Sequence, residues 1–443
     1  MPKASTPAGR RAAAVYLPFR RAVRGIGQDA AMDFPLLTTD LPGTGGVLKD
    51  RPEDFVVDEI PLYPASGAGD HVYFRVEKVG ISTREAIRRI AAHLRAPEAK
   101  FGFAGLKDAR AVARQTLSLE HASPSTLEGL VLPGVRVLSV KRHRNRLRVG
   151  HLAGNRFEVR LRGVVAGAAE RAEAILAVLR ARGLPNGFGP QRFGTREDTH
   201  LVGRALVRGD AKEAAGLLLG RPSPLERDPR VLEARRRYDA GDIEGARRSF
   251  PPSFGTEKRV LERLAAGDSP EEALRSVPRA VRRFFVSALQ SALFNRVLAG
   301  RLRTLNVLYA GDLAWIHGKG AVFLVEDPAR DQGRCDAFEV SPSGPLFGMK
   351  MVAPRGATGE REAAVLAEEG LAPTAFDVRG VSRFEGGRRP LRVPVGEPTV
   401  RAEGEDLLLA FSLPRGSYAT GLLAEVTKSG AGGDLDAGPG GEE

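Results

Sequence analysis

One carboxylate in this sequence stands where it could do chemistry. Asp108 follows a turn expected at Gly105 and lies between two cations, Lys107 and Arg110. Opposite charges a few ångströms away favour the charged form of an acid, so we expect Asp108 to be ionised. An ionised carboxylate is a usable base or nucleophile toward sugar-type and conjugated carbon centres. The alternative is that Asp108 only caps a short helix beginning at Ala109, as a lone aspartate at a turn often does.

The composition indicates a partner for a polyanion. The 443 residues include 67 Lys plus Arg against 54 Asp plus Glu, which gives a formal charge of +13 and a pI near 10.2. Nucleic acid is the first candidate for such a partner, although an arginine-rich bias in composition also raises the pI. The length predicts two or three domains with ample room for a core.

Several classes of protein are excluded by the same sequence. A single cysteine, Cys335, rules out an internal disulfide, and neither it nor the seven histidines have the spacing of a zinc site. Mean hydropathy is -0.20, and no uncharged apolar run reaches the roughly eighteen residues of a membrane-spanning helix. We therefore expect a cytoplasmic protein with no metal, no cofactor and no membrane contact.

Strand and helix signals surround Asp108. In residues 70–77 apolar and polar side chains alternate, which is the period of a half-buried strand. Ser82 and Glu85 form a capping box ahead of an apolar helical stripe. The stretch FGFAGL is then typical of another strand and a turn. Strand, helix and strand in this order predict an α+β fold, and residues 201–305 are typical of helices.

A basic stretch follows the Asp108 region. Residues 136–162 hold nine Lys or Arg and one acid, Glu158. Apolar and cationic residues alternate in its last part, so a strand there would bury one face and offer phosphates the other. An edge strand charged against aggregation is the alternative. Gly154-Asn155 is expected as the turn before this strand, where Asn155 is either a turn residue or a polar group aimed at a base.

Two later segments combine rings with flexible backbone. Residues 186–194, NGFGPQRFG, place two phenylalanines and Arg192 among glycines. This suits close approach to a nucleotide, on which rings stack, and a hinge between domains is the alternative. The stretch PRGSYATGLLAEV indicates a turn entering a helix, with Tyr418 in the first helical turn and its ring facing either the core or a ligand.

Taken together, the ordered motifs of the chain resemble the TruD family of tRNA pseudouridine synthases. The motifs are GVLKDRPEDFVVDE, GDHVYFRVEKVGISTR, FAGLKDARAVARQ, HLAGNRFEVRLR, NGFGPQRFG, SALQSALFN and LPRGSYAT, spread over roughly residues 43–428. Any one motif is weak, whereas the ordered set is specific. One departure is Tyr418, since this position is commonly Phe in the family, and the polarity of that wall is changed.

The resemblance implies a fold and a domain organisation. The fold is α+β, a pseudouridine synthase-type catalytic domain with a mixed, largely antiparallel sheet, interrupted by an inserted, family-specific TRUD domain. The catalytic domain would comprise residues 41–185 and 385–428, and the insertion residues 186–384. A basic arm at 1–40 and a tail at 429–443 are expected to be disordered.

The resemblance also implies the site and the reaction. The family's aspartate nucleophile falls on Asp108, and its substrate contacts fall on Phe55, Asn155 and Tyr418. Lys107 and Phe157 are near neighbours by the same matching. The implied substrate is tRNA, with uridine 13 of the D-arm as the usual target, and the implied enzyme needs no cofactor. The oligomeric state does not follow from the sequence, and a monomer is our expectation. Whether the carboxylate attacks C6 of uracil or C1′ of the ribose stays open.

Two other classes of function stay open from the sequence. The first is an RNA-binding protein without catalysis, beside a pseudouridine synthase that acts on another RNA. The second is a carboxylate-dependent nucleoside or glycoside hydrolase, which needs a second acid close to Asp108. Glu53, Asp54 and Glu59 are the candidates for that acid.

Overall fold

The computed structural model describes residues 35–428, so most of the predicted arm and the whole predicted tail, residues 429–443, lie outside the described part of the chain. The first described segment is not a free arm. Leu37 and Thr38 are buried, and their backbone N–H groups donate to the Glu425 carboxylate at 2.6 and 3.0 Å. The ordered fold therefore begins before residue 41, where the catalytic domain was expected to start.

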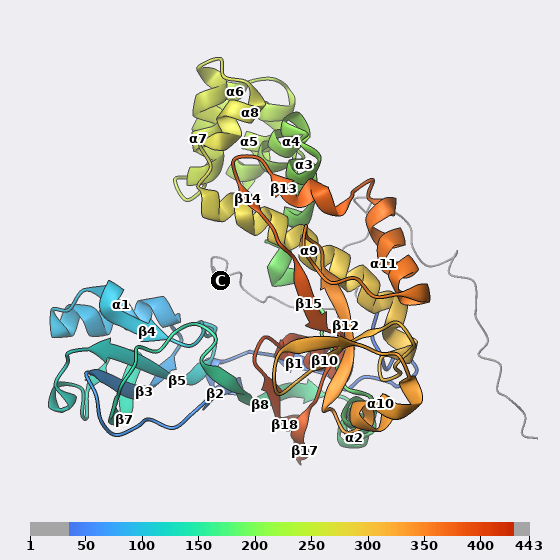
Figure 1. Ribbon diagram of the computed structural model, residues 1–443. Coiled ribbons are helices and arrows are strands. Elements are labelled where there is room, and N and C mark those ends of the chain that lie inside the picture. Colours follow the sequence, from blue (N-terminus) through green and yellow to red (C-terminus); the bar gives the residue numbers. More distant parts are fainter. Residues whose placement is uncertain (1–34, 429–443) are drawn as a thin grey trace, which may run out of the picture. The chain divides into compact units, whose positions relative to one another are not determined.

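A ten-stranded sheet carries the Asp108 region (Figure 1). Its strands are β1 (Gly45–Leu48), β2 (Phe55–Pro61), β3 (His71–Val79), β4 (Phe101–Phe103), β5 (Val112–Glu120), β6 (Val131–Leu132), β7 (Val135–His143), β8 (Leu152–Val164), β17 (Gly396–Glu403) and β18 (Asp406–Pro414). The order is β17-β18-β8-β2-β5-β3-β7-β6, with β1 paired to β8 and β4 to β5. Only β2 and β5 run parallel. The predicted mixed, largely antiparallel sheet is confirmed.

Alternation in the sequence explains the central strands. Val72, Phe74 and Val76 of β3 are fully buried, as the strand prediction for residues 70–77 requires. The prediction of a turn at Gly154-Asn155 is wrong, because both residues lie inside β8. A Cβ at Gly154 would lie 2.3 Å from the Leu413 carbonyl oxygen. This glycine is thus required by the close approach of β18 and not by a turn.

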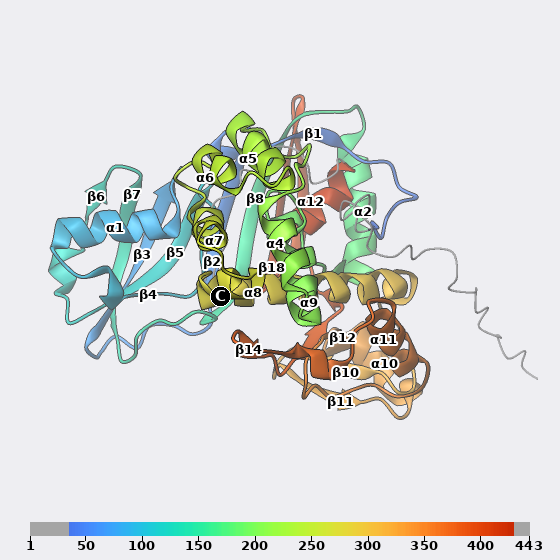
Figure 2. The same ribbon diagram turned by 90° about the horizontal axis from the view of Figure 1, so that it is seen from above.

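Helices cover the sheet through apolar stripes. Helix α1 (Thr83–Leu94) begins where Ser82 accepts a hydrogen bond from the Glu85 N–H at 3.2 Å, which confirms the predicted helix start. Its apolar face packs on the buried face of β3 and β7. Helices α2 (Ala168–Arg182) and α12 (Ala419–Thr427) lie side by side and share a second core with β8 and β18 (Figure 2).

Residues 199–301 form the expected run of helices. They are α3 (Thr199–Arg208), α4 (Ala211–Leu219), α5 (Pro229–Asp239), α6 (Ile243–Ser249), α7 (Gly255–Ala265), α8 (Pro270–Arg275) and α9 (Arg279–Arg301). Ser269 and Glu272 form a capping box at the start of α8. Short 3-10 turns lie elsewhere at Pro52–Asp54, Glu98–Lys100, Pro124–Thr126, Pro190–Phe193, Leu302–Thr304 and Pro373–Phe376.

A second, four-stranded sheet follows α9. It contains β10 (Leu313–Ile316), β11 (Ala321–Leu324), β12 (Val340–Leu346) and β15 (Gly387–Pro390), accompanied by α10 (Pro328–Asp336), α11 (Gly356–Glu368) and the pair β13 (Asp377–Val378) and β14 (Ser382–Arg383). The strands β9 (Leu184–Pro185) and β16 (Arg392–Val393) then pair antiparallel. The chain thus leaves and re-enters the region of the ten-stranded sheet at one place. Within residues 35–428 no helix is both long and apolar enough to cross a membrane.

Candidate active site

Asp108 lies on the loop that joins the edge strand β4 to the central strand β5. Its carboxylate is about one-third exposed, with a side-chain exposure of 33%. The Lys49 ammonium donates to Oδ2, and the Arg110 backbone N–H donates to Oδ1 at 3.0 Å. Lys49 follows β1 directly and has a left-handed backbone, with φ of 57°. One oxygen is therefore held by a nearly buried cation while the carboxylate keeps a face toward solvent.

The charges around Asp108 keep it ionised. Burial raises the pKa of this carboxyl, but the charge and hydrogen bond of Lys49, the Arg110 N–H and the charge of Lys78 together lower it below its ordinary value. The charged form is favoured because each of these groups stabilises the carboxylate and not the acid. The expectation of an ionised Asp108 agrees with this geometry, in which Lys49 and Lys78 act on the carboxylate and Lys107 does not contact it.

Lys107 turns away from Asp108 and into the sheet. Its ammonium lies 2.6 Å from Asn155 Oδ1 and 3.1 Å from Glu59 Oε2. The Glu59 side chain is only 2% exposed, and a carboxylate buried to that degree requires a partner charge. The ion pair with Glu59 therefore explains why the Lys107 ammonium does not contact the Asp108 carboxylate. The Lys107 backbone N–H is also fixed, donating to Thr83 Oγ1 at 2.8 Å.

Lys78, like Lys49, is a site residue that sequence reasoning missed. It is fully buried, and its ammonium donates to the backbone carbonyls of Asp108 at 2.5 Å and Ile81 at 2.6 Å. Burial lowers the pKa of Lys78 to about 8. A signal was available, because Lys78 occupies the next inward position after Val76 in the alternation of β3. A lysine in a buried register has to have polar partners.

Phe55 and Phe157 form a packed ring pair next to Lys49. They are 4% and 6% exposed, and their centroids lie 6.0 Å apart at an interplanar angle of 63°. The Lys49 ammonium lies 4.4 Å from the Phe55 centroid, and Phe157 stacks on Phe411 at 5.3 Å. One face of Phe55 is thus occupied by the lysine that holds Asp108. The two rings support the site from below.

Tyr418 forms a separate wall. Its side chain is 41% exposed, and it caps α12, which begins at Ala419, one residue later than predicted. Its ring centroid lies 6.2 Å from that of Phe188, and the Arg389 guanidinium covers Phe188 at 4.4 Å. Asn295 holds Phe188 at both backbone groups. The register of β8 with β18 sets Asn155 opposite Leu413, which leads directly into the Tyr418 loop.

The ring-bearing segment 186–194 is built into the fold. Phe193 is fully buried and meets the His200 ring edge-on at 5.4 Å, while Phe188 is 8% exposed and meets Phe294 at 5.6 Å. Arg192 lies over Phe188 and bonds Ser291 Oγ at 3.1 Å. The two phenylalanines therefore pack in the core and do not offer free faces to a nucleotide.

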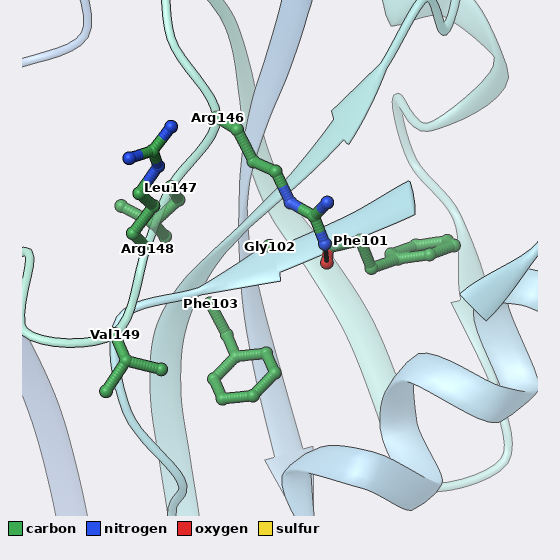
Figure 3. A pocket seen from close by; sticks show the side chains of 7 residues that line it. All are labelled: Phe101, Gly102, Phe103, Arg146, Leu147, Arg148 and Val149. Atoms are coloured by element: carbon green, nitrogen blue, oxygen red, sulfur yellow. Dashed lines mark hydrogen bonds between the residues drawn. The ribbon is translucent and has the colours of Figure 1, made fainter. Parts of the chain in front are cut away.

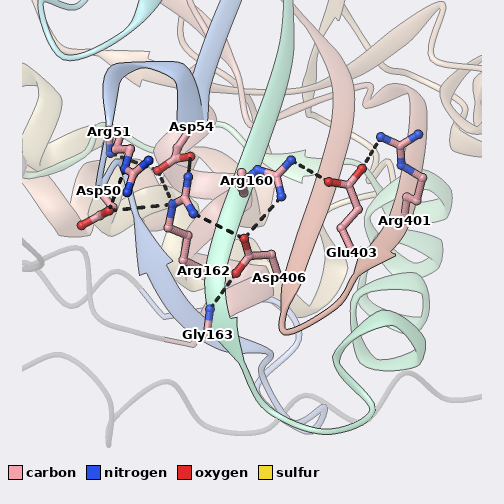
Figure 4. A network of polar contacts seen from close by, with 9 residues as sticks. All are labelled: Asp50, Arg51, Asp54, Arg160, Arg162, Gly163, Arg401, Glu403 and Asp406. Carbon is pink, nitrogen blue, oxygen red and sulfur yellow. Dashed lines mark hydrogen bonds and ion pairs between the residues drawn. The ribbon is translucent and has the colours of Figure 1, made fainter.

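The cationic face predicted for β8 is largely neutralised by carboxylates (Figure 4). Arg160 pairs with Glu403 at 2.6 Å and Asp406 at 3.3 Å, and Arg162 pairs with Asp54 at 2.7 Å. Both arginines serve the sheet by tying β8 to β18 and to the turn before β2. A surface for phosphates has to be sought elsewhere.

Two of the three acids suggested for a hydrolase are occupied in other contacts. Asp54 accepts two hydrogen bonds from the Arg162 guanidinium, at 2.8 and 2.7 Å, and Glu59 is paired with Lys107. Glu53 lies exposed in the same turn as Asp54. Nor do residues 35–428 contain a group of three or more His, Cys, Asp or Glu side chains placed to hold a metal ion.

The comparisons with known proteins agree on one family. The model of tRNA pseudouridine synthase D (TruD) matches residues 31–426. Relatives named tRNA pseudouridine synthase D from Geobacter metallireducens and Geobacter sulfurreducens are 50% and 51% identical over 397 residues, covering 89% of this chain and 98% and 97% of theirs. The crystal structure of a putative tRNA pseudouridine synthase D (TruD) from Methanosarcina mazei matches with a TM-score of 0.76 at 28% identity, covering 90% of this chain and 96% of that one.

The fold is α+β, and its mixed sheet carries the loop with the ionised Asp108. Together with these matches, this fold and site define an enzyme of the pseudouridine synthase class, whose members are isomerases. The chain belongs to the TruD family of tRNA pseudouridine synthases. The resemblance read from the sequence motifs is thereby confirmed at the level of family and fold.

Proposed function

We propose that this enzyme converts uridine 13 in the D-arm of tRNA to pseudouridine, with Asp108 as the nucleophile. The observation that carries the proposal is the carboxylate itself. Asp108 is ionised, accessible to solvent, and held by Lys49 at one oxygen and by the Arg110 N–H at the other. It also occupies the family's motif position for the nucleophile, which follows the lysine of AGLKD.

The conversion of uridine to pseudouridine requires a carboxylate and is an isomerisation, so substrate and product have the same composition. The N1–C1′ bond of uridine breaks, the uracil rotates, a C5–C1′ bond forms, the C5 hydrogen leaves as a proton and N1 takes one up. Asp108 would either add to C6 of the uracil or attack C1′ of the ribose, and both routes need the ionised form. The lysines that hold the pKa of Asp108 down keep that form available at neutral pH.

The residues of the proposed site would hold a flipped base. Extruding a base costs a few kcal/mol, which stacking and hydrogen bonds in the site repay. We propose that Tyr418 is the stacking wall, because its ring is the exposed one of the three candidate aromatics. Asn155, fixed by Lys107, would hydrogen-bond the uracil edge. Phe55 and Phe157 would shape the floor without presenting free faces.

The same proposal includes a division into domains. Strands of the ten-stranded sheet come from residues 45–164 and 396–414, and the four-stranded sheet extends to Pro390. We therefore propose a catalytic domain interrupted by a TRUD domain, as expected from the sequence, with the return near residue 391 and not 385. The β9–β16 pair marks the point where the chain crosses in both directions.

The proposal is tested by mapping pseudouridine in unmodified tRNA after incubation with the purified protein and no added cofactor. We expect one new pseudouridine, at position 13, and none in a matched tRNA that carries cytidine there. A pseudouridine at another position would overturn the assignment of the target. Untouched tRNA and untouched total RNA would instead support an RNA-binding protein without catalysis.

A further inference from the structure

A cluster of exposed cations lies at the end of β7 and in the connection between β7 and β8, away from the neutralised arginines of β8. We call it the β7–β8 basic surface, and its members are Lys141, Arg142, Arg144, Arg146 and Arg148. No acid occurs in the sequence between Glu128 and Glu158. In the described part of the chain none of the five forms an ion pair with a carboxylate, in contrast to Arg160 and Arg162. Their positive charge is therefore available to a partner.

The basic surface is fixed in place by neutral contacts. Arg146 donates to the carbonyls of Ala99, at 2.7 Å, and Phe101, and the Leu147 N–H donates to Ser118 Oγ at 3.1 Å. A Cβ at Gly102 would lie 2.3 Å from the Leu147 carbonyl oxygen, so the loop crosses β4 at a point where only glycine fits. Carbonyl partners orient a guanidinium without cancelling its charge.

A pocket of about 350 Å³ opens beneath this loop (Figure 3). Its lining combines apolar side chains, among them Phe103 and Val149, with Arg146 and Arg148. In Figure 3 the Phe103 ring and the Val149 side chain extend to the same side of β4. Val149 is 61% exposed, so an apolar side chain borders the pocket where a partner could reach it. An apolar floor beside Arg146 and Arg148, whose charges no carboxylate of the described residues neutralises, suits a base and its phosphate.

The pocket adjoins the Asp108 loop. Strand β4, which supplies Phe103, runs directly into that loop, and the Gly150 N–H donates to the Ala104 carbonyl at 2.8 Å. Arg415, in the loop that precedes Tyr418, donates to the Gly150 carbonyl at 2.8 Å. The basic surface is therefore tied to both loops that carry proposed site residues. RNA bound there would lie next to the reacting uridine.

We infer that the β7–β8 basic surface binds the RNA strand beside the target uridine, with Arg144 and Arg148 on backbone phosphates and an unpaired base in the pocket between Phe103 and Val149. The inference rests on the proposed function for the identity of the RNA. Arg144 and Arg148 suit the phosphate role because they are exposed and no side-chain partner is recorded for either within residues 35–428.

The double variant Arg144→Ala/Arg148→Ala tests the phosphate contacts. We expect tRNA to bind roughly 10-fold or more weakly near 0.1 M salt, and the slope of log Kd against log salt to fall by about two, one for each phosphate contact. Arg401→Ala is the matched control, because Arg401 is also an exposed arginine but is already paired with Glu403. The control should leave affinity and slope unchanged.

Val149→Glu tests the pocket without disturbing the core. A carboxylate there would repel the RNA strand, so we expect KM for tRNA to rise at least several-fold with little change in kcat. Val352→Glu is the control, since Val352 is 59% exposed, close to the 61% of Val149. An equal effect of the two glutamates would overturn the base-pocket assignment.

The two proposals fail in distinguishable ways. If wild type forms pseudouridine while the double variant matches it in affinity, salt slope and KM, the surface inference is wrong and the proposed function stands. If wild type forms no pseudouridine but the double variant still loses affinity and slope, the surface binds RNA and the proposed function is wrong.

Discussion

At the scale of residues, the site is an arrangement of three lysines with different duties. Lys49 is the counter-charge of Asp108, Lys78 holds the backbone on which Asp108 sits, and Lys107 neutralises the buried Glu59 and fixes Asn155. As a result the Asp108 carboxylate stays charged while part of it remains exposed to solvent. Each lysine can be tested separately, because one contacts the Asp108 carboxylate, one the Asp108 backbone carbonyl, and one the Glu59 and Asn155 side chains.

Removing the Lys49 charge should weaken Asp108 as a nucleophile. In Lys49→Met, burial would raise the pKa of Asp108 with its main opposing cation gone, so the acidic limb of the pH–rate profile should move to higher pH. We expect kcat at neutral pH to fall on the order of 10²-fold. The control is Arg51→Met, which removes an exposed cation from the same segment. An unshifted acidic limb in Lys49→Met would contradict this role.

Lys78 should give the enzyme an alkaline limit. Because burial lowers its pKa to about 8, the ammonium that grips the Asp108 and Ile81 carbonyls loses its proton above that pH, and we expect kcat to fall. Lys78→Met should be slower at neutral pH and should lack this limb. Rates measured from pH 6 to 9.5 on both proteins check the prediction, and persistence of the limb in the variant would refute it.

Unfolding does not account for that limb. The pKa of Lys78 is lowered from an ordinary value of 10.5, so between about pH 8 and 10.5 the unfolded chain binds more protons than the folded one. The contribution of Lys78 to the free energy of unfolding therefore rises with pH over this range. A fall in rate with unchanged or higher stability isolates the local effect.

At the scale of elements, α9 supports the Tyr418 wall through a polar side chain in its buried face. Asn295 accepts from the Phe188 N–H at 2.9 Å and donates to the Phe188 carbonyl at 2.8 Å. Asn295→Ala would leave both buried backbone groups unpaired, at a cost of roughly 2 kcal/mol or more. We expect a lower Tm and a higher KM, with an intermediate effect for Asn295→Asp, which keeps the acceptor. Equal stability of Asn295→Ala and wild type would contradict the proposed role of the two Asn295–Phe188 hydrogen bonds.

Sequence patterns predicted the elements better than their partners. The alternation of Val72, Phe74 and Val76 and the cap at Ser82 gave the strand and the helix that frame the site, because both signals are local. The pairing of Arg162 with Asp54, 108 residues apart, and of Lys107 with Glu59 depends on strand neighbours that no local pattern records. For that reason the sequence did not reveal that Arg160 and Arg162 of β8 are paired with carboxylates.

At the scale of the whole molecule, the two ends of the described chain are joined by one buried carboxylate. Glu425 accepts from the Leu37 and Thr38 N–H groups and from Thr38 Oγ1 at 2.5 Å. Glu425→Ala should lower the free energy of unfolding by about 2 to 4 kcal/mol, since three donors lose their partner. Denaturant unfolding checks this, with Glu425→Gln, which keeps an acceptor, expected between the two. Unchanged unfolding of Glu425→Ala would show that the contacts of this carboxylate contribute nothing to stability.

The net charge of +13 is unevenly used across the molecule. Many arginines, such as Arg160 and Arg235, are paired with carboxylates and hold the fold together. The β7–β8 basic surface keeps its charge, and it lies where a polyanion approaching Asp108 would meet it. Composition alone indicated a polyanionic partner, but only the ion pairs distinguish structural arginines from those free to bind one.

The central claim is that Asp108 carries the isomerisation, and one comparison tests it most directly. Wild type and Asp108→Asn are incubated with tRNA tritiated at C5 of uridine, and tritium release is measured beside tRNA affinity. We predict release by wild type, no detectable release by Asp108→Asn, and the same Kd for both within a few-fold. Tritium release by Asp108→Asn at the wild-type rate would contradict the account.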